Sequence, residues 1–209
     1  MAADPPPLRI SRLRRRLGSA DVVQDLSLTL GPGDRIALRG PNGSGKTTVL
    51  RCAAGTMAPT SGVVEVGGAA AGSFAARARC GVALAQERSF FMRLSGLENL
   101  RYFARARLRS KAAAEREVAA VLSELGLESI ATRRMDRCST GMVQQLGFAR
   151  ALLGSPAVLL LDEPTRSLDT AAVERLWEAL ERRPATALLI STHHDDDAAR
   201  CGGSIDLPR

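Results

Sequence analysis

The stretch Gly40-Pro41-Asn42-Gly43-Ser44-Gly45-Lys46-Thr47 constrains this chain more than any other part of its sequence. It follows an alternating apolar run, residues 34–39, and precedes a helical pattern, residues 48–54. The glycines allow the backbone to curl with its N–H groups pointing inward, because no Cβ stands in the way. The positive end of the helix dipole adds to this anion site. The segment therefore predicts a strand, a phosphate-binding loop and a helix in that order.

The spacing of the loop matches the P-loop motif, Gly-x-x-x-x-Gly-Lys-Ser/Thr, which binds nucleoside triphosphates. We expect Lys46 to reach the terminal phosphates and the Thr47 hydroxyl to ligate Mg²⁺, with Thr48 among the nucleotide-binding residues. The alternative is a glycine-rich surface turn with a chance lysine, which would leave the flanking strand and helix unexplained.

A second motif consists of the apolar residues Val158–Leu161 followed by Asp162 and Glu163. A buried strand would deliver Asp162 to the Mg²⁺ beside the phosphates. Glu163 can hold the water that attacks the γ-phosphate. The alternative is an acidic cluster at an exposed strand end, and the upstream P-loop favours the catalytic interpretation.

The rest of the sequence alternates strand and helix patterns, which indicates an α/β fold with a largely parallel sheet. We expect strands at 8–10, 22–30, 63–66, 81–85, 158–161, 185–191 and 204–207, helices at 74–79, 94–109, 112–125, 139–153 and 170–183, and a polar turn at 195–200. One domain over 1–209 is therefore expected, with a P-loop core at 1–85 and 155–209 and an inserted helical subdomain at 86–154.

The helical segment 139–153 opens on Cys138-Ser139-Thr140-Gly141-Met142. With the two earlier motifs, this segment makes the chain resemble the ATP-binding cassette family, whose signature is Leu-Ser-Gly-Gly-Gln or a close variant. Ser139 and Gly141 match, whereas Cys138, Thr140 and Met142 depart from the pattern. A serine hydroxyl and glycine N–H groups at a helix start form a second anion site. The resemblance implies that Ser139, Thr140, Gly141 and Met142 face the γ-phosphate of ATP held by another subunit; alone, Ser139 would be a simple helix N-cap.

The resemblance covers nearly the whole chain and implies a RecA-like P-loop core with an antiparallel β part. Gln86 matches a glutamine that touches Mg²⁺ and the attacking water, and Asp169 lies in the loop that crosses the dimer interface. His193 matches the histidine that contacts the γ-phosphate, where a neutral imidazole can donate a hydrogen bond. The neighbouring His194 is expected to be a bystander.

One departure concerns the base. The family usually stacks adenine on an aromatic residue just before the second strand, where this chain has Arg16, Leu17 and Gly18. We therefore expect Leu17 to contact the base, with weaker selectivity for adenine.

The composition of the chain limits the kinds of molecule that it is expected to bind. The net charge is +7 and comes almost entirely from arginine, since Lys46 and Lys111 are the only lysines. Aromatic residues make up 3% of the chain, which argues against a nucleic-acid surface built on base stacking. The sequence has no apolar run long enough to span a bilayer, no secretory signal and scattered cysteines, so we expect reduced thiols in a cytosol. The short segment after the last strand predicts no C-terminal regulatory tail.

These features and the resemblance predict an ATPase subunit of a bacterial exporter, similar to exporters of drugs, polysaccharides or haem. The expected ligands are ATP and Mg²⁺, bound between two copies of the chain or between paired subunits. A separate polytopic permease would hold the protein at the inner face of the cell membrane, with docking at residues 90–93, which we expect to be an exposed apolar surface; the alternative is ordinary core packing. The competing interpretation is a soluble ATPase of the same family acting on DNA or ribosomes, but the helical insertion is too short for a coiled coil and the chain carries one cassette. A plain P-loop kinase would leave residues 139–141 unexplained.

Overall fold

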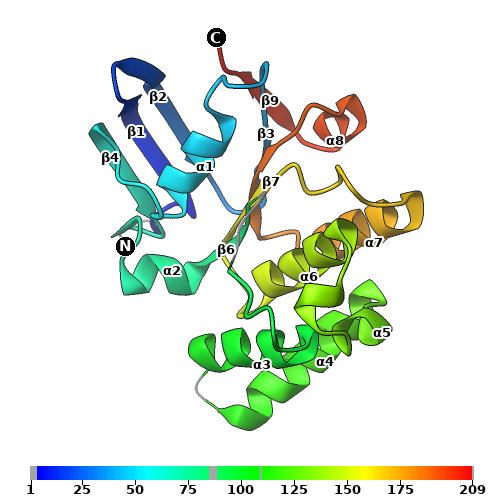
Figure 1. Cartoon of the computed structure of the whole chain (residues 1–209). Coiled ribbons are helices and arrows are strands. Elements are labelled where there is room, and N and C mark those ends of the chain that lie inside the picture. The colour runs from blue at the N-terminus through cyan, green and yellow to red at the C-terminus, as the bar shows by residue number, and fades with distance from the viewer. Residues whose placement is uncertain (1–3, 85–88, 109, 209) are drawn as a thin grey trace.

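A computed structural model describes residues 4–84, 89–108 and 110–208. In this part of the chain, one sheet is antiparallel, with strand order β2-β1-β4-β5, and the other is parallel, with order β6-β7-β8-β3-β9 (Figure 1). The strands are β1 (Leu8–Leu17), β2 (Ala20–Leu30), β3 (Arg35–Arg39), β4 (Ser61–Val66), β5 (Ala69–Ala70), β6 (Cys80–Ala83), β7 (Val158–Asp162), β8 (Ala187–Ser191) and β9 (Gly203–Asp206). The predicted α/β fold with a parallel and an antiparallel part is confirmed.

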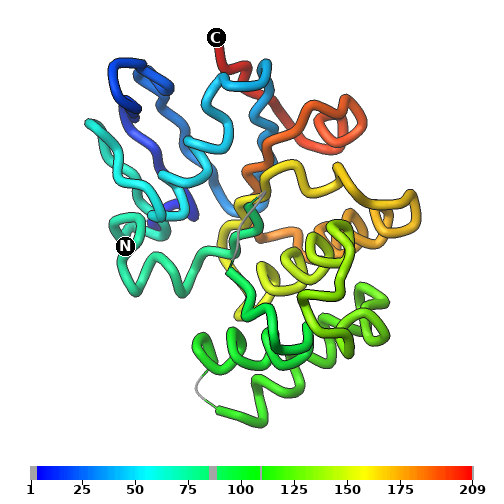
Figure 2. Tube along the Cα trace, viewed as in Figure 1, coloured from blue at the N-terminus to red at the C-terminus, as the bar shows by residue number. Residues whose placement is uncertain are grey.

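Most helices occupy segments expected from the sequence, with shifted ends, but the short helices at Glu128–Ala131 and Asp195–Ala199 were not predicted. The helices are α1 (Lys46–Ala53), α2 (Phe74–Arg79), α3 (Gly96–Arg107), α4 (Lys111–Leu125), α5 (Glu128–Ala131), α6 (Thr140–Leu152), α7 (Thr170–Glu181) and α8 (Asp195–Ala199), with a 3-10 turn at Met135–Arg137. The trace in Figure 2 places α3, α4 and α5 at one end of the molecule and the antiparallel sheet at the other. Among the described residues, no helix is both long and apolar enough to cross a membrane.

The parallel sheet is covered on both faces, as its continuous apolar strands require. Alternate side chains of β7 point to opposite faces. Val158 and Leu160 pack with α1 and the antiparallel sheet, whereas Leu159 and Leu161 pack with α3, α4, α6 and α7. Helices α1 and α6 therefore pack on opposite faces of the sheet.

Strand β1 extends well beyond the strand expected at 8–10. Arg12 has a positive φ of 47°, and the pairing of β1 with β2 shifts between Ile10 and Leu13. This bulge turns both Ile10 and Leu13 into the core although they are three positions apart. The arginine-rich run 12–16 and the broken alternation concealed the rest of the strand.

The segment expected to be a polar turn at 195–200 contains the short helix α8. Three consecutive acidic residues, Asp195–Asp197, form its first turn. Negative side chains are favourable beside the N–H groups that a helix start leaves unpaired. The acidic run was therefore a helix-start signal rather than a turn signal.

Candidate functional site

The glycine loop joins β3 to α1, as predicted. Gly45 has a φ of 94°, and a Cβ there would lie 2.6 Å from the carbonyl oxygen of Val22. A Cβ on Gly40 would lie 2.5 Å from the carbonyl oxygen of Leu207. A side chain at either position would collide with backbone, so the tight curl of the loop depends on both glycines.

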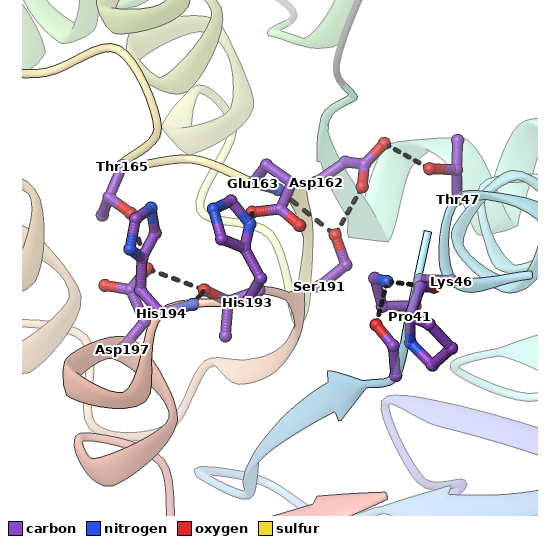
Figure 3. A network of polar contacts seen from close by, with 12 residues as sticks. Pro41, Lys46, Thr47, Asp162, Glu163, Thr165, Ser191, His193, His194 and Asp197 are labelled. Carbon is purple, nitrogen blue, oxygen red and sulfur yellow. Dashed lines mark hydrogen bonds and ion pairs between the residues drawn. The ribbon is translucent and has the colours of Figure 1, made fainter. Parts of the chain in front are cut away.

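The polar groups of the loop fit an anion. Lys46 is buried, and its Nζ donates to the carbonyl oxygens of Gly40 at 2.6 Å and Pro41 at 3.0 Å, as Figure 3 shows. Ser44 Oγ is also buried and has no hydrogen-bond partner within the described part of the chain. An orphaned hydroxyl and a positive charge beneath a loop of backbone N–H groups are what a phosphate requires.

The acidic strand end meets the P-loop helix directly. Asp162 is buried at the end of β7, and Thr47 Oγ1 donates to its Oδ2 at 2.9 Å. Ser191 Oγ, at the end of β8, donates to Asp162 Oδ1. Strand β8 lies between β7 and β3, and Ser191 Oγ also accepts from the Glu163 N–H at 3.2 Å, so Ser191 contacts both acids of the motif (Figure 3).

This donor set fits Mg²⁺. The described residues include no group of three His, Cys, Asp or Glu side chains able to hold a metal ion by themselves. Mg²⁺ beside a nucleotide is bound through one or two protein oxygens together with phosphates and waters. Asp162 and the Thr47 hydroxyl provide such a pair.

Glu163 has an unusual backbone. Its φ of 48° lies in the left-handed region, which is uncommon for a residue with a side chain. Its N–H donates to the carbonyl oxygen of Ser191 at 3.0 Å, and its own carbonyl accepts from Gln144 Nε2 at 2.6 Å. Bonds from two separate elements thus hold a conformation that costs energy.

The predicted histidine lies beside this acid. His193 Nδ1 is 2.6 Å from Glu163 Oε2, and the His193 side chain is half exposed (Figure 3). The ring of His194 lies 4.1 Å from the ring of His193, and it is His193 that contacts Glu163. The structure thus brings Lys46, Thr47, Asp162, Glu163 and His193 to one edge of the parallel sheet.

The signature segment begins α6, and its Thr140 lines a cavity that Asp162 and Glu163 also line. Ser139 is the N-cap of α6 and accepts from the backbone N–H of Met142 at 3.2 Å, while Thr140 beside it is exposed. A Cβ on Gly141 would lie 2.5 Å from the carbonyl oxygen of Ser167, so glycine allows α6 to approach that loop. The role of these residues toward a second subunit stays a prediction.

Of three further predicted residues, Asp169 and Leu17 lie in the described part of the chain and Gln86 does not. Asp169 is the N-cap of α7, where its Oδ1 accepts from Ala172 N at 2.8 Å. Leu17 ends β1 and is 43% exposed. Gln86 lies outside the described residues. The roles expected for all three stay predictions.

Two residues of the site were missed in the sequence, Ser191 and Gln144. Ser191 could have been found, because the carboxyl ends of neighbouring parallel strands meet at one edge and it ends an apolar strand just before His193. Gln144 gave no comparable signal, since its contact with Glu163 depends on how α6 packs.

The segment expected at a docking surface, residues 90–93, divides into two parts. Phe90 is buried: its ring meets that of Phe103 edge-on at 6.1 Å, and the Arg150 guanidinium lies 4.9 Å from its centre. Phe91 and Met92 are 47% and 50% exposed. The expectation of exposure was wrong for Phe90, which is an anchor for the segment.

Comparisons with known proteins give a consistent picture. Residues 23–166 match the sequence profile of the family described as ABC transporter. The Nod factor export ATP-binding protein I of Cupriavidus pinatubonensis is 37% identical over 196 residues, which are 92% of this chain and 60% of that protein. The Fe(3+) ions import ATP-binding protein FbpC of Agrobacterium fabrum is 34% identical over 197 residues, which are 93% of this chain and 56% of that protein.

A solved structure shares the fold. The ATP-binding cassette MJ0796, a dimer in a post-hydrolysis state bound to ADP and Pi, superposes with a TM-score of 0.85 at 22% identity, covering 96% of this chain and 94% of that one. The present chain spans about 60% of the length of curated relatives that it matches.

Proposed function

This chain belongs to the ABC transporter family, and from that premise we propose that it binds and hydrolyses ATP to drive a separate membrane permease. The observation that carries the proposal is the continuous contact from Thr47 through Asp162 and Ser191 to Glu163 and His193. The glycine loop at 40–47, two acids and a histidine thus lie along one sheet edge, which supports an ATPase site. The relatives of this chain include proteins named for import and for export.

ATP is the substrate of this proposal. The backbone N–H groups of the P-loop and the Lys46 ammonium would hold its phosphates. Mg²⁺, when bound, would neutralise phosphate charge, and Asp162 with the Thr47 hydroxyl would hold it. Leu17 would offer the base an apolar contact.

The hydrolytic step needs an oriented water, and Glu163 supplies the acceptor. Its carboxylate would accept a hydrogen bond from the water that attacks the γ-phosphate. Because the backbone of Glu163 is held by Ser191 and Gln144, the carboxylate has a defined position. His193, in contact with that carboxylate, would donate to a γ-phosphate oxygen.

We further propose that two copies, or two paired subunits, enclose two ATP molecules. The start of α6, with Ser139 and Thr140, is exposed, which leaves this segment accessible to a second subunit. Ser139 and Gly141 of one subunit would then contact the γ-phosphate bound by the other.

The permease would dock on the exposed part of residues 90–93. Phe91, Met92 and Tyr102 form a half-exposed apolar surface, with the Phe91 and Tyr102 rings 4.9 Å apart. The residues that line one cavity of about 570 Å³ include Phe90 and Met92 as well as Asp162 and Glu163. This continuity supports a mechanical link between the permease and the hydrolytic site, with the protein peripheral on the inner face of the membrane.

For the direction of transport we propose export. The Ser-Thr-Gly-Met sequence at 139–142 resembles exporters, and one relative is named for Nod factor export. Transport into inverted vesicles containing the permease would support export, whereas uptake by right-side-out vesicles would contradict it.

The central test compares the wild type with Glu163→Gln after co-purification with the membrane protein encoded next to it. We expect the wild type to hydrolyse ATP and the variant to bind ATP, release almost no phosphate and form a stable dimer, because an amide cannot accept the proton of the attacking water. Hydrolysis by the variant at the wild-type rate, or an ATP-bound monomer at full activity, would contradict the proposal.

A further inference from the structure

One buried carboxylate outside the contacts described above joins the segments that carry both Glu163 and His193. Asp197, in α8, is 3% exposed. Its Oδ2 accepts from Thr165 Oγ1 at 2.5 Å and from Thr192 Oγ1 at 3.0 Å. Its Oδ1 accepts from Trp177 Nε1 at 3.2 Å. A buried charge is tolerated only when hydrogen bonds satisfy it, and these three donors do so.

The two threonines that donate to Asp197 lie next to the site residues in the sequence. Thr165 lies two residues after Glu163, and Thr192 directly precedes His193. Both threonines are buried, and the Thr192 N–H also donates to the carbonyl oxygen of Leu38 at the end of β3. One carboxylate therefore ties the segment after β7 to the segment after β8 (Figure 3).

We propose that Asp197 is a positioning residue for the hydrolytic site: by holding Thr165 and Thr192 on one carboxylate, it keeps Glu163 opposite His193. The inference rests on the proposed ATPase function for its kinetic readout. The hydrogen bonds of the Asp197 carboxylate within the described part of the chain go to Thr165, Thr192 and Trp177, so its effect passes through the two threonines. Hydrogen bonds to a charged acceptor are stronger than neutral ones, which suits a fixed link between two loops.

Trp177 provides a reporter at this link. It is the single tryptophan of the chain and is 1% exposed in α7. Its indole N–H is bonded to Asp197, and the Arg200 guanidinium lies 5.5 Å from its ring. Tryptophan emission therefore comes from one site, beside the carboxylate in question.

The experiment compares Asp197→Asn with Asp196→Asn in the full chain. Asp196 is exposed in the same first turn of α8, so its replacement removes the same charge near the helix start but no buried hydrogen bond. We expect Asp197→Asn to lower kcat per bound nucleotide by about tenfold to hundredfold, because a displacement near 1 Å at a catalytic group has effects of this size. KM for ATP should stay within about twofold, because the P-loop is untouched. Asp196→Asn should match the wild type.

Fluorescence separates positioning from loss of fold. In the wild type, addition of ATP and Mg²⁺ should change the emission of Trp177, because His193 and Glu163 are tied to its partner. Asp197→Asn should bind ATP at the same stoichiometry and lose that change in emission. Retention of both kcat and the emission change in Asp197→Asn would overturn the inference. A wild type that hydrolyses no ATP would instead refute the proposed function.

A second set of variants applies where Asp197→Asn does not fold. Thr192→Val and Thr165→Val remove one hydroxyl each at nearly constant volume, and Thr→Ser at the same positions keeps it. We expect the valine variants to lose kcat and the serine variants to retain it. Because both hydroxyls act through one carboxylate, the double valine variant should lose less than the product of the single losses. Equal kcat in the valine and serine variants, or fully multiplicative losses, would overturn the inference.

Discussion

Gln144 Nε2 donates to the backbone carbonyl of Glu163 across 2.6 Å. Gln144 belongs to α6, which begins after Ser139, and Glu163 follows β7 with a φ of 48°. This bond joins the helix of the signature segment to the acid of the hydrolytic site within one chain. A displacement of α6 therefore acts directly on the strained backbone that aims Glu163.

We expect Gln144→Ala to lower kcat by about tenfold, because loss of the bond frees a backbone conformation that neighbouring contacts must hold in place. KM for ATP should change little, since the P-loop is unaffected. Steady-state hydrolysis measures both values. Gln145→Ala is the matched control, because it removes the same amide from the adjacent position. Equal losses of kcat in the two variants would show that helix packing, not the bond to Glu163, causes the effect.

Because Leu17 stands where the family usually has an aromatic residue, we predict weak discrimination between adenine and guanine. The exposed aliphatic side chain of Leu17 can contact a base but cannot stack on it as an aromatic ring does. We expect ATP and GTP to bind the wild type with similar affinity. Leu17→Tyr should raise the affinity for both by about tenfold, because stacking on an aromatic ring contributes about 1–3 kcal/mol and every base offers a π-face. Equilibrium binding of fluorescent analogues measures this; no gain with tyrosine would mean that the base binds elsewhere.

Substitution of Phe90 should destabilise the fold much more than substitution of Phe91. Phe90→Ala removes a buried ring that packs on Phe103 and Arg150, so the free energy of unfolding should fall by about 3 kcal/mol. Phe91→Ser combined with Met92→Ser should change it by about 1 kcal/mol or less, since both side chains are half exposed. Denaturant unfolding measures the difference.

The same double substitution should reduce permease binding while ATP hydrolysis by the isolated chain persists. Co-purification with the permease and hydrolysis without it provide the two measurements. Unchanged binding and transport would place the docking surface elsewhere.

Glu124 should contribute stability that depends on pH. Arg183 donates to both of its carboxylate oxygens, at 2.8 and 2.7 Å, and this hydrogen bonding lowers the pKa of Glu124 below its ordinary 4.5. A lowered folded-state pKa means that the contribution is present above the unfolded pKa and is lost as the pH falls through the folded value. At pH 7, Glu124→Gln should lower the free energy of unfolding by about 1 kcal/mol.

Urea unfolding at several pH values tests this. The difference between wild type and Glu124→Gln should be constant from pH 7 down to about 5 and shrink below 4.5. Glu178→Gln is the control, because Glu178 is exposed and should show no measurable difference. A difference that persists unchanged at the lowest pH would assign the effect to packing rather than to charge.

The sequence was most informative where one local motif defines one local structure. The loop at 40–47 requires glycines for steric reasons, and the apolar strand before Asp162 has few alternative structures, so both were predicted with nearly correct bounds. The family resemblance is confirmed by the match over residues 23–166. What failed depended on contacts between distant segments. Burial of Phe90 under Arg150 and the bond from Gln144 to Glu163 arise only when α6 packs on the sheet.

The bulge in β1 shows a second reason for failure. Alternation of apolar residues predicts a strand only while the period of two persists, and Arg12 inserts one residue between Ile10 and Leu13. The strand continues, but the buried positions change from even-numbered residues, such as Leu8 and Ile10, to the odd-numbered Leu13. No count of apolar residues in a window would show this without the partner strand.

Asn99 is fully buried, and its side-chain amide binds both the N–H and the carbonyl oxygen of Phe91. Asn99 lies in α3, so these two bonds couple the backbone of Phe91 to that helix. A neighbouring molecule that displaces the half-exposed Phe91 would therefore also displace α3, instead of moving only the loop that carries Phe91. Asn99→Leu would keep the exposed apolar surface but would remove the two hydrogen bonds that connect it to α3.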